Sequence, residues 1–172
     1  MTDNPANPTL CVAFADSTLG RLLVAGTPQG LCALLIGDDQ AVLRADLARR
    51  FPQAIIEPAT ADFEATLAQV ALQVEQPQRS CSLPLHVRGT AFQQRVWQAL
   101  RAIAPGQTRS YTQIAAQIQA PRAYRAVAQA CGANPLAVVI PCHRVVGSDG
   151  RLSGYRWGVE RKAELLRREH AA

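Results

Sequence analysis

The sequence predicts an α+β fold of two domains: a small N-terminal α/β domain over residues 1–83 and a mainly helical C-terminal domain over residues 84–172. Short apolar runs separated by turn residues fill the start of the chain, which is typical of a meander of strands. Two capping boxes in the second half are each followed by a helical pattern. The charge also changes sign, because residues 1–87 carry a net charge of −4 and residues 88–172 a net charge of +9.

Length and composition narrow the class of protein. A chain of 172 residues with 48% hydrophobic and 18% charged residues can bury a core and is not disordered. It contains no run of 18 apolar residues, so we expect no membrane span. The basic second half favours a polyanionic partner. The alternative is a gradient of surface charge that has no function.

The cysteines favour a reducing compartment. They are odd in number, widely spaced and without a C-x-x-C pair, and the N-terminus does not resemble a signal peptide. We therefore expect free thiols and a cytoplasmic protein of the bacterial cytosol. With three histidines and no clustered ligands, the sequence indicates no metal site, and it implies no cofactor.

In the first half, glycine-containing turns separate three expected strands, and two helices follow. The first helix is expected over residues 40–50, and the second begins at the cap Thr60. A polar segment with a proline, residues 76–89, is interpreted as the linker. The expected strands are residues 10–14, 21–25 and 31–36.

The second half predicts a helix-turn-helix. Capping boxes at Thr90–Gln93 and Ser110–Gln113 start two helices, and the first of these ends at Pro105. Pro121 suits the first position of a third helix, which ends at Gly132. Two short helices joined by a tight turn form the candidate motif.

The third helix has two different faces. Long polar side chains occupy one face and small apolar ones the other, as a DNA-recognition helix needs. A surface helix with two solvated arginines fits the same pattern, and both interpretations stay open. The polar face holds Arg122, Arg125 and Gln129, and the apolar face holds Ala123, Val127 and Ala130.

The candidate reactive centre follows an apolar run, residues 136–140, which we expect to be a buried strand. It leads into Pro141, Cys142, His143 and Arg144. A thiol near basic groups ionises more easily, and the thiolate is the nucleophile. Adjacent side chains on an extended chain point to opposite sides, so His143 would need a kinked backbone or a bridging water. An inert buried thiol is the alternative. Carboxylates that could orient the histidine are Glu160, Glu164 and Glu169.

The segment Ile140–Val145 resembles the active-site signature of the methylated-DNA–protein-cysteine methyltransferases, the 6-O-alkylguanine-DNA alkyltransferases. The resemblance covers nearly the whole chain, weakly before Pro84 and strongly after it. It is greatest to the C-terminal methyltransferase part of a bacterial adaptive-response protein, without the zinc-thiolate domain that precedes that part, so we expect a stand-alone repair enzyme. Further matching segments are Arg88–Trp97, Ser110–Tyr111, Arg125–Val127, Asn134–Pro135 and Leu152–Gly158.

The resemblance implies a ribonuclease H-like N-terminal domain, a winged helix-turn-helix and a function. The protein would repair DNA by irreversible, single-turnover transfer of an alkyl group from a flipped-out 6-O-alkylguanine, and from 4-O-methylthymine, to Cys142. His143, through a bound water, and Glu169 would draw the proton from the thiol. Asn134 would tie the helix-turn-helix to the active-site loop, and Tyr111 would donate a proton to the leaving guanine.

The implied partner is double-stranded DNA carrying alkylated guanine, bound by a monomer through its minor groove, with no membrane involved. Arg125 would fill the space left by the extruded base. Further expected DNA contacts are Arg122, Tyr111, Ala123, Ala126, Gln129 and Arg144. Expected contacts to the guanine are Val145, Ser153 and Tyr155.

Two hypotheses from other classes compete with this one. A cysteine hydrolase could use Cys142, His143 and Glu169 as a triad, but it would leave the basic helix-turn-helix unexplained. A non-enzymatic binder of DNA lesions, similar to the alkyltransferase-like proteins, would lack the cysteine that this chain has at position 142.

Overall fold

The computed structural model describes residues 7–170, which fold into two compact units. Unit 1 contains the residues up to Glu75 and the segment Cys81–Val87, and unit 2 contains Gln76–Ser80 and the residues from Arg88 onward. The expected boundary after residue 83 lies within Cys81–Val87. No helix in the described part of the chain is long and apolar enough to cross a membrane.

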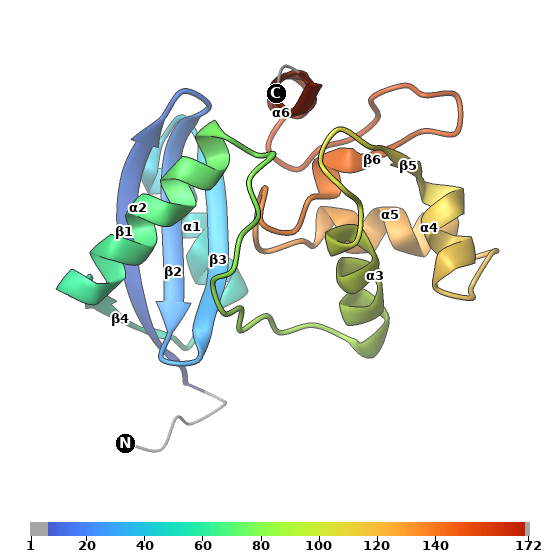
Figure 1. The fold of residues 1–172 in the computed structure, drawn as a ribbon. Helices are drawn as coiled ribbons and strands as arrows, with labels where there is room; N and C mark the ends of the chain where they lie inside the picture. Colours follow the sequence, from blue (N-terminus) through green and yellow to red (C-terminus); the bar gives the residue numbers. More distant parts are fainter. Residues whose placement is uncertain (1–6, 171–172) are drawn as a thin grey trace. The chain divides into compact units, whose positions relative to one another are not determined.

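Unit 1 is built on a four-stranded sheet in the order β3-β2-β1-β4 (Figure 1). The meander of β1 (Thr9–Ser17), β2 (Gly20–Thr27) and β3 (Gly30–Gly37) is antiparallel, as the sequence predicts. The turn before β3 places Gly30 at φ 146°, where glycine is favoured. A Cβ at this position would lie 2.5 Å from the carbonyl oxygen of Pro84, so the close approach of the two segments also requires glycine.

Two helices cover the two faces of the sheet, one on each side (Figure 1). The first, α1 (Gln40–Arg50), begins at the N-cap Asp39, whose carboxylate accepts the N–H of Ala41 at 2.7 Å. The second, α2 (Ala61–Glu75), follows the predicted cap Thr60, whose hydroxyl accepts the N–H of Phe63 at 3.3 Å. Successive side chains of β2 and β3 are buried, which is possible only because both faces of the sheet are covered.

One strand of unit 1 was not expected. β4 (Ile55–Pro58) pairs in parallel with the start of β1 at the edge of the sheet. All four of its residues are exposed, so the strand shows no alternation of buried and exposed positions for a sequence pattern to detect. The prediction of a three-stranded meander is therefore correct but incomplete.

The described part of unit 2 contains four α-helices and a two-stranded parallel sheet. Both predicted capping boxes are present, at Thr90 and Ser110, each with its two reciprocal hydrogen bonds. Trp97 is buried and its Nε1 donates to the carbonyl of Ala130 at 2.9 Å, which joins the first helix of the unit to the third. The helices are α3 (Ala91–Arg101), α4 (Tyr111–Gln117), α5 (Tyr124–Gly132) and α6 (Val159–His170), and the strands are β5 (Arg109–Ser110) and β6 (Val145–Val146).

Two elements of unit 2 differ from the prediction. The third helix begins at Tyr124 and not at Pro121, because the N–H of Ala123 bonds back to Ala120 and closes a tight turn first. The apolar run 136–140 is buried as expected but is not a strand. Its backbone groups bond within the segment, and Val138 lies at φ 67°, so the run forms a compact turn.

Candidate active site

Cys142 follows a tightly closed loop and opens a single 3-10 turn, η1 (Cys142–Arg144). The loop is closed by the fully buried Asn134, whose Nδ2 donates to the carbonyl of Ile140 at 2.8 Å and to Cys142 Sγ at 3.2 Å. The Asn134 Oδ1 accepts the N–H of Leu136 at 2.9 Å. A single amide thus uses both its donor and its acceptor to shape the loop and hold the sulfur.

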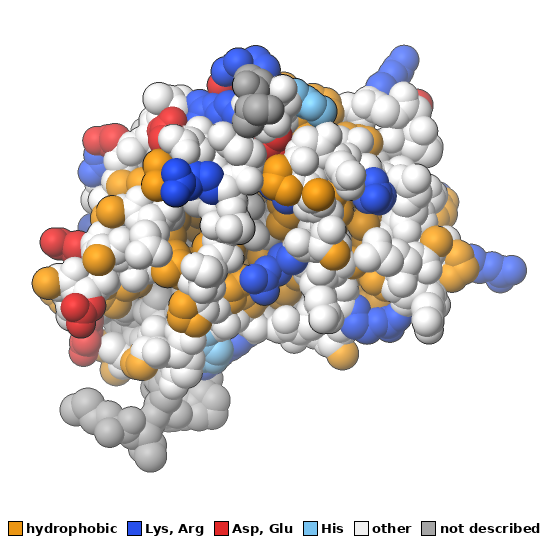
Figure 2. Space-filling view, viewed as in Figure 1, with side chains coloured by type: hydrophobic (Ala, Val, Ile, Leu, Met, Phe, Trp, Pro, Cys, Tyr) orange, Lys and Arg blue, Asp and Glu red, His pale blue; other side chains and the backbone are white. Residues whose placement is uncertain are grey.

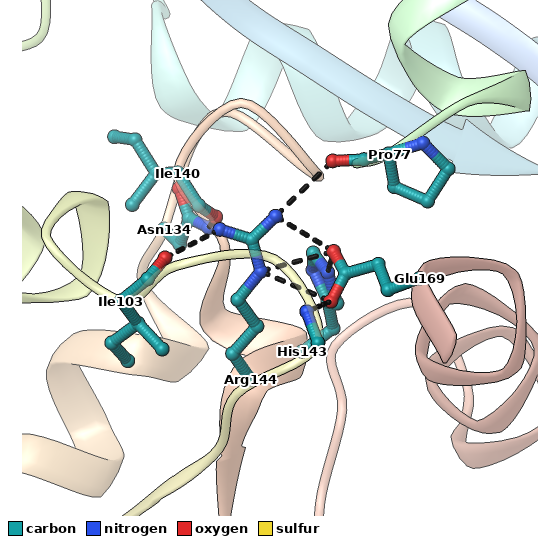
Figure 3. A network of polar contacts seen from close by, with 8 residues as sticks. Pro77, Ile103, Asn134, Ile140, His143, Arg144 and Glu169 are labelled. Atoms are coloured by element: carbon teal, nitrogen blue, oxygen red, sulfur yellow. Dashed lines mark hydrogen bonds and ion pairs between the residues drawn. The ribbon is translucent and has the colours of Figure 1, made fainter. Parts of the chain in front are cut away.

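Next to this turn, the carboxylate of Glu169 in α6 binds both His143 and Arg144, the two residues that follow Cys142 (Figure 3). Its Oε1 lies 2.7 Å from Nε2 of His143. Arg144 donates to the same carboxylate from Nε at 3.0 Å and from Nη2 at 2.7 Å. The remaining guanidinium donors reach the carbonyls of Ile103 at 2.7 Å and Pro77 at 3.1 Å.

This network corrects one prediction. Arg144 was expected to contact DNA, but its side chain is 7% exposed and its donors are used inside unit 2. A guanidinium that bonds a carboxylate and two carbonyls is fixed in place. Of the three candidate carboxylates, Glu169 is the one beside His143, whereas Glu164 pairs with arginines of its own helix.

The electrostatics of the pair assign a tautomer to His143. Burial, its largest influence, and the nearby Arg144 lower the pKa of His143, which keeps the imidazole neutral. Burial opposes ionisation of Glu169, but hydrogen bonds from His143 and Arg144 outweigh it and bring the pKa of Glu169 to about 2. The proton of the neutral imidazole therefore lies on Nε2, facing the carboxylate, and Nδ1 is an acceptor. Nδ1 is buried and has no hydrogen-bond partner among the described residues.

We predict that stability falls as the pH falls. The folded pKa of His143 is depressed below 6.5, and that of Glu169 lies at about 2 against an ordinary 4.5, so both groups bind protons more readily in the unfolded chain. Stability should begin to fall below about pH 6.5, and Glu169 alone should account for a loss of about 3 kcal/mol between pH 4.5 and 2. Urea unfolding at a series of pH values measures this loss, and a stability that stays constant from pH 6.5 to 3 would contradict it.

The Cys142 thiol is protonated at rest. Burial raises the pKa of Cys142 to about 11, although the Asn134 amide and the charge of Lys162 favour the thiolate. The sulfur at neutral pH is therefore a thiol, which needs a base to become a nucleophile.

A pocket of about 540 Å³ opens onto this sulfur. Five predicted site residues line it, and all of them belong to unit 2: Tyr111, Arg125, Cys142, Ser153 and Tyr155. Six further lining residues are not among the predicted site residues, although Gly154 and Arg156 belong to the matching segment Leu152–Gly158: Tyr124, Ala128, Cys131, Gly132, Gly154 and Arg156.

The two tyrosines of the pocket keep their protons. The hydroxyl of Tyr111 donates to the carbonyl of Ser153 at 3.2 Å, and burial raises the pKa of the phenol. Burial raises the pKa of Tyr155 still further, and its hydroxyl has no hydrogen-bond partner within residues 7–170. Both groups are therefore available as neutral hydrogen-bond donors.

The other predicted residues lie outside the pocket lining. Arg122 and Gln129 are exposed, and Ala123 and Ala126 are half-buried. Val145 is buried in β6, paired with β5. On the face shown in Figure 2, acidic side chains gather mainly over unit 1, while arginines are spread over unit 2. No group of three or more potential metal ligands occurs in the part of the chain that the structure describes.

Lys162 is a second buried cation that sequence reasoning missed. Its side chain on α6 is fully buried, and Nζ donates to the carbonyls of Ser153 at 3.1 Å and Gly154 at 3.2 Å. A signal was present in the sequence, because Lys162 is the single lysine among 18 basic residues.

Two family models match the chain. Residues 10–86 match "6-O-methylguanine DNA methyltransferase, ribonuclease-like domain", and residues 91–171 match "6-O-methylguanine DNA methyltransferase, DNA binding domain". Among curated proteins, the chain is 56% identical over 157 residues to the bifunctional transcriptional activator/DNA repair enzyme Ada of Escherichia coli, covering 91% of this chain and 44% of that protein. The chain spans about half the length of the curated relatives it matches.

Solved structures match over nearly the full length. Mycobacterium tuberculosis O6-methylguanine methyltransferase is 36% identical, with a TM-score of 0.73 over 94% of this chain and 93% of that one. The structure of M. tuberculosis OGT in complex with DNA is 37% identical, with a TM-score of 0.76 over 95% of this chain and 93% of that one. The sequence matches and the structural matches therefore both extend over units 1 and 2.

Proposed function

Because the chain belongs to the 6-O-methylguanine DNA methyltransferase family, we propose that it repairs DNA by moving the alkyl group of a 6-O-alkylguanine to its own Cys142. The observation that carries the proposal is a buried thiol that opens onto a pocket and is held by Asn134 next to the His143–Glu169 pair. The proposed setting is the bacterial cytosol, where the five cysteines, all free thiols, stay reduced. We extend the substrate class to 4-O-methylthymine.

In the proposed reaction, the sulfur of Cys142 attacks the alkyl carbon, so that a carbon–sulfur bond forms and the carbon–oxygen bond to guanine breaks. The thiol proton passes through a bound water to Nδ1 of His143, and Glu169 stabilises the resulting imidazolium. The proton then returns to solvent. The product is a thioether, which has no leaving group that would regenerate the thiol, so each molecule reacts once.

The leaving guanine needs a proton, and Tyr111 is its proposed donor. Its phenol lines the pocket, stays protonated, and bonds only a carbonyl oxygen that a substrate atom can replace as acceptor. Donation to the base as the bond breaks neutralises the charge that develops there, and the phenol then recovers a proton from solvent. Ser153 and Tyr155 border the same pocket and are the proposed contacts to the base; the Val145 contact would be made by backbone.

We propose that α4 and α5 carry the DNA contact in the minor groove. Arg125 is exposed on α5 and also lines the pocket, so one side chain can enter the duplex beside the base that leaves it. The half-buried Ala123 and Ala126 allow a close approach, and the exposed Arg122 and Gln129 are the proposed polar contacts. Base extrusion costs a few kcal/mol, which the inserted guanidinium offsets in part.

The test is a count of repaired lesions per protein molecule. Duplex DNA with one 6-O-methylguanine is added in excess, and the proposal predicts that repair stops at one lesion per protein, with none repaired by Cys142→Ser. A cysteine hydrolase would instead turn over an ester substrate repeatedly. A lesion binder would bind the duplex and leave the base alkylated. Either result would contradict alkyl transfer.

A further prediction concerns Arg125. If its guanidinium offsets the cost of extrusion, Arg125→Ala should slow repair of duplex DNA by about 10- to 100-fold, yet slow the reaction with free 6-O-methylguanine less than about threefold. Single-turnover rates measure the two effects, one with saturating duplex DNA and the other with free 6-O-methylguanine. The matched control is Arg122→Ala, which removes an exposed arginine outside the pocket and should weaken binding without slowing the bound reaction. Equal losses on both substrates would remove the flipping role of Arg125.

A further inference from the structure

Lys162 is an unusual residue in this chain. Every other basic side chain is an arginine, and the one lysine is fully buried. Burial of an ammonium is costly unless the charge is paired or hydrogen-bonded. Two of its N–H bonds go to the carbonyls of Ser153 and Gly154. These two residues form part of the pocket wall that also contains Cys142.

The surroundings of Lys162 contain thiols and no carboxylate partner. Within residues 7–170 the structure gives its ammonium no ion pair with Asp or Glu. The anions whose charge acts on it are the ionised forms of Cys142 and, to a lesser degree, Cys131. The other titratable groups around this pair are the tyrosines Tyr111 and Tyr155, which are neutral at physiological pH, and His143, whose pKa the charge of Lys162 helps to lower. Formation of the thiolate would therefore supply the counter-charge that the buried ammonium lacks.

We propose that Lys162 is a positioning residue of the alkyl-acceptor site: its ammonium holds the Ser153–Gly154 wall of the pocket and balances the charge of the Cys142 thiolate. The inference rests on the proposed function for the identity of the nucleophile. It adds a cation to a site in which the nearby arginine, Arg144, is neutralised by Glu169.

One carbonyl links Lys162 to the proposed proton donor. The oxygen of Ser153 accepts from Lys162 Nζ at 3.1 Å and from the Tyr111 hydroxyl at 3.2 Å. Lys162 therefore fixes an acceptor that orients the phenol, as well as the wall itself. The compact ammonium on a long stem can reach two neighbouring carbonyls from inside the core, whereas the planar guanidinium of arginine is larger and distributes its donors differently.

The first experiment measures the pH dependence of Cys142 reactivity without DNA. Iodoacetamide labels the thiolate, and tandem mass spectrometry separates labelling at Cys142 from labelling at the other cysteines. Loss of a nearby positive charge in Lys162→Met should move the midpoint of the rate profile upward by about one pH unit, so that labelling at pH 8 slows about tenfold. The matched control is Arg161→Met, the neighbouring cation on α6, which should leave the midpoint in place.

A purely structural role would change the rate of repair but not this midpoint, so an unchanged midpoint in Lys162→Met would overturn the proposal.

The second experiment keeps the lysine, in case the variant does not fold. Protein labelled with ¹⁵Nζ-lysine gives one side-chain signal, because the chain has one lysine. The pKa of Lys162 should be lower in Cys142→Ser than in the wild type, since the thiolate that raises it can no longer form.

The Cys131→Ser variant should lower the pKa of Lys162 by less, because Cys131 acts more weakly on the ammonium. Identical titrations in the wild type and Cys142→Ser would overturn the proposal. Neither experiment involves alkylated DNA. A protein that fails to repair DNA but shows both the shift in the Cys142 labelling midpoint and the shift in the Lys162 pKa would contradict the proposed function. The pairing of Lys162 with Cys142 would still be supported.

Discussion

Replacing Glu169 by glutamine should lower the free energy of unfolding by about 3–5 kcal/mol, because it removes the counter-charge of a buried arginine. The carboxylate accepts three bonds from Arg144, one from His143 and one from the N–H of Gly106, and the side chain is fully buried. A glutamine of the same size offers one oxygen and presents an NH₂ group to donors. It also stops holding the His143 proton on Nε2, so alkyl transfer should slow as well. Urea unfolding at pH 7 measures the stability change.

The matched control is Glu164→Gln, on the same helix. Glu164 also pairs with two arginines, Arg167 and Arg168, and hydrogen bonds from them bring its pKa to about 2. Its side chain is 32% exposed, however, and that of Arg167 is 66% exposed, and ion pairs at the surface contribute little. The urea midpoint should therefore stay close to that of the wild type. If Glu169→Gln and Glu164→Gln lost similar amounts of unfolding free energy, burial would not be the reason why the Glu169 ion pair stabilises the fold.

The second large effect is expected at Asn134. Asn134→Leu keeps the volume of the side chain but leaves the carbonyl of Ile140 and the N–H of Leu136 buried without these partners. Each of the two unpaired groups costs about 1–3 kcal/mol, so we expect a loss of about 2–6 kcal/mol in unfolding free energy. The thiolate also loses an N–H donor, and labelling of Cys142 by iodoacetamide at pH 8 should slow about tenfold.

Asn134→Asp separates the two functions of this amide. The aspartate keeps an acceptor for Leu136 but, when ionised, cannot donate to Ile140 or Cys142 and repels the thiolate. When protonated it can donate again, so its stability relative to the wild type should recover as the pH falls from 7.5 to 5.5. If Asn134→Leu were as stable as the wild type, with Cys142 equally reactive, the amide would have no part in shaping the loop.

Much of the fold follows from local signals in the chain. The capping boxes at Thr90 and Ser110 and the glycine turns of the meander predict the elements that the structure contains, because each depends on neighbouring residues alone. β4 could not be predicted, since its pairing with β1 is non-local and its side chains are exposed. The run 136–140 is as apolar as a buried strand, and the Asn134 bonds that make it a turn have no signature in its pattern.

The sequence predicts some residues of the site and not others, because the burial of a side chain depends on non-local contacts. The family motif includes Asn134, Cys142 and His143, and the structure brings them together with Glu169. The same motif contains Arg144, and the sequence does not distinguish an arginine that faces DNA from one that is buried against a carboxylate. Lys162 was missed because it lies on a charged helix, where only its complete burial separates it from the arginines around it.

The intact mass of the protein tests the alkyl-transfer account most directly. The protein is incubated with duplex DNA that contains one 6-O-methylguanine per molecule, and the whole chain and its peptides are weighed. The account predicts a gain of one methyl group per chain, located on Cys142 and absent in Cys142→Ser. A chain of unchanged mass after the DNA has lost its methyl group, or a methyl group found on Cys131 instead, would contradict it.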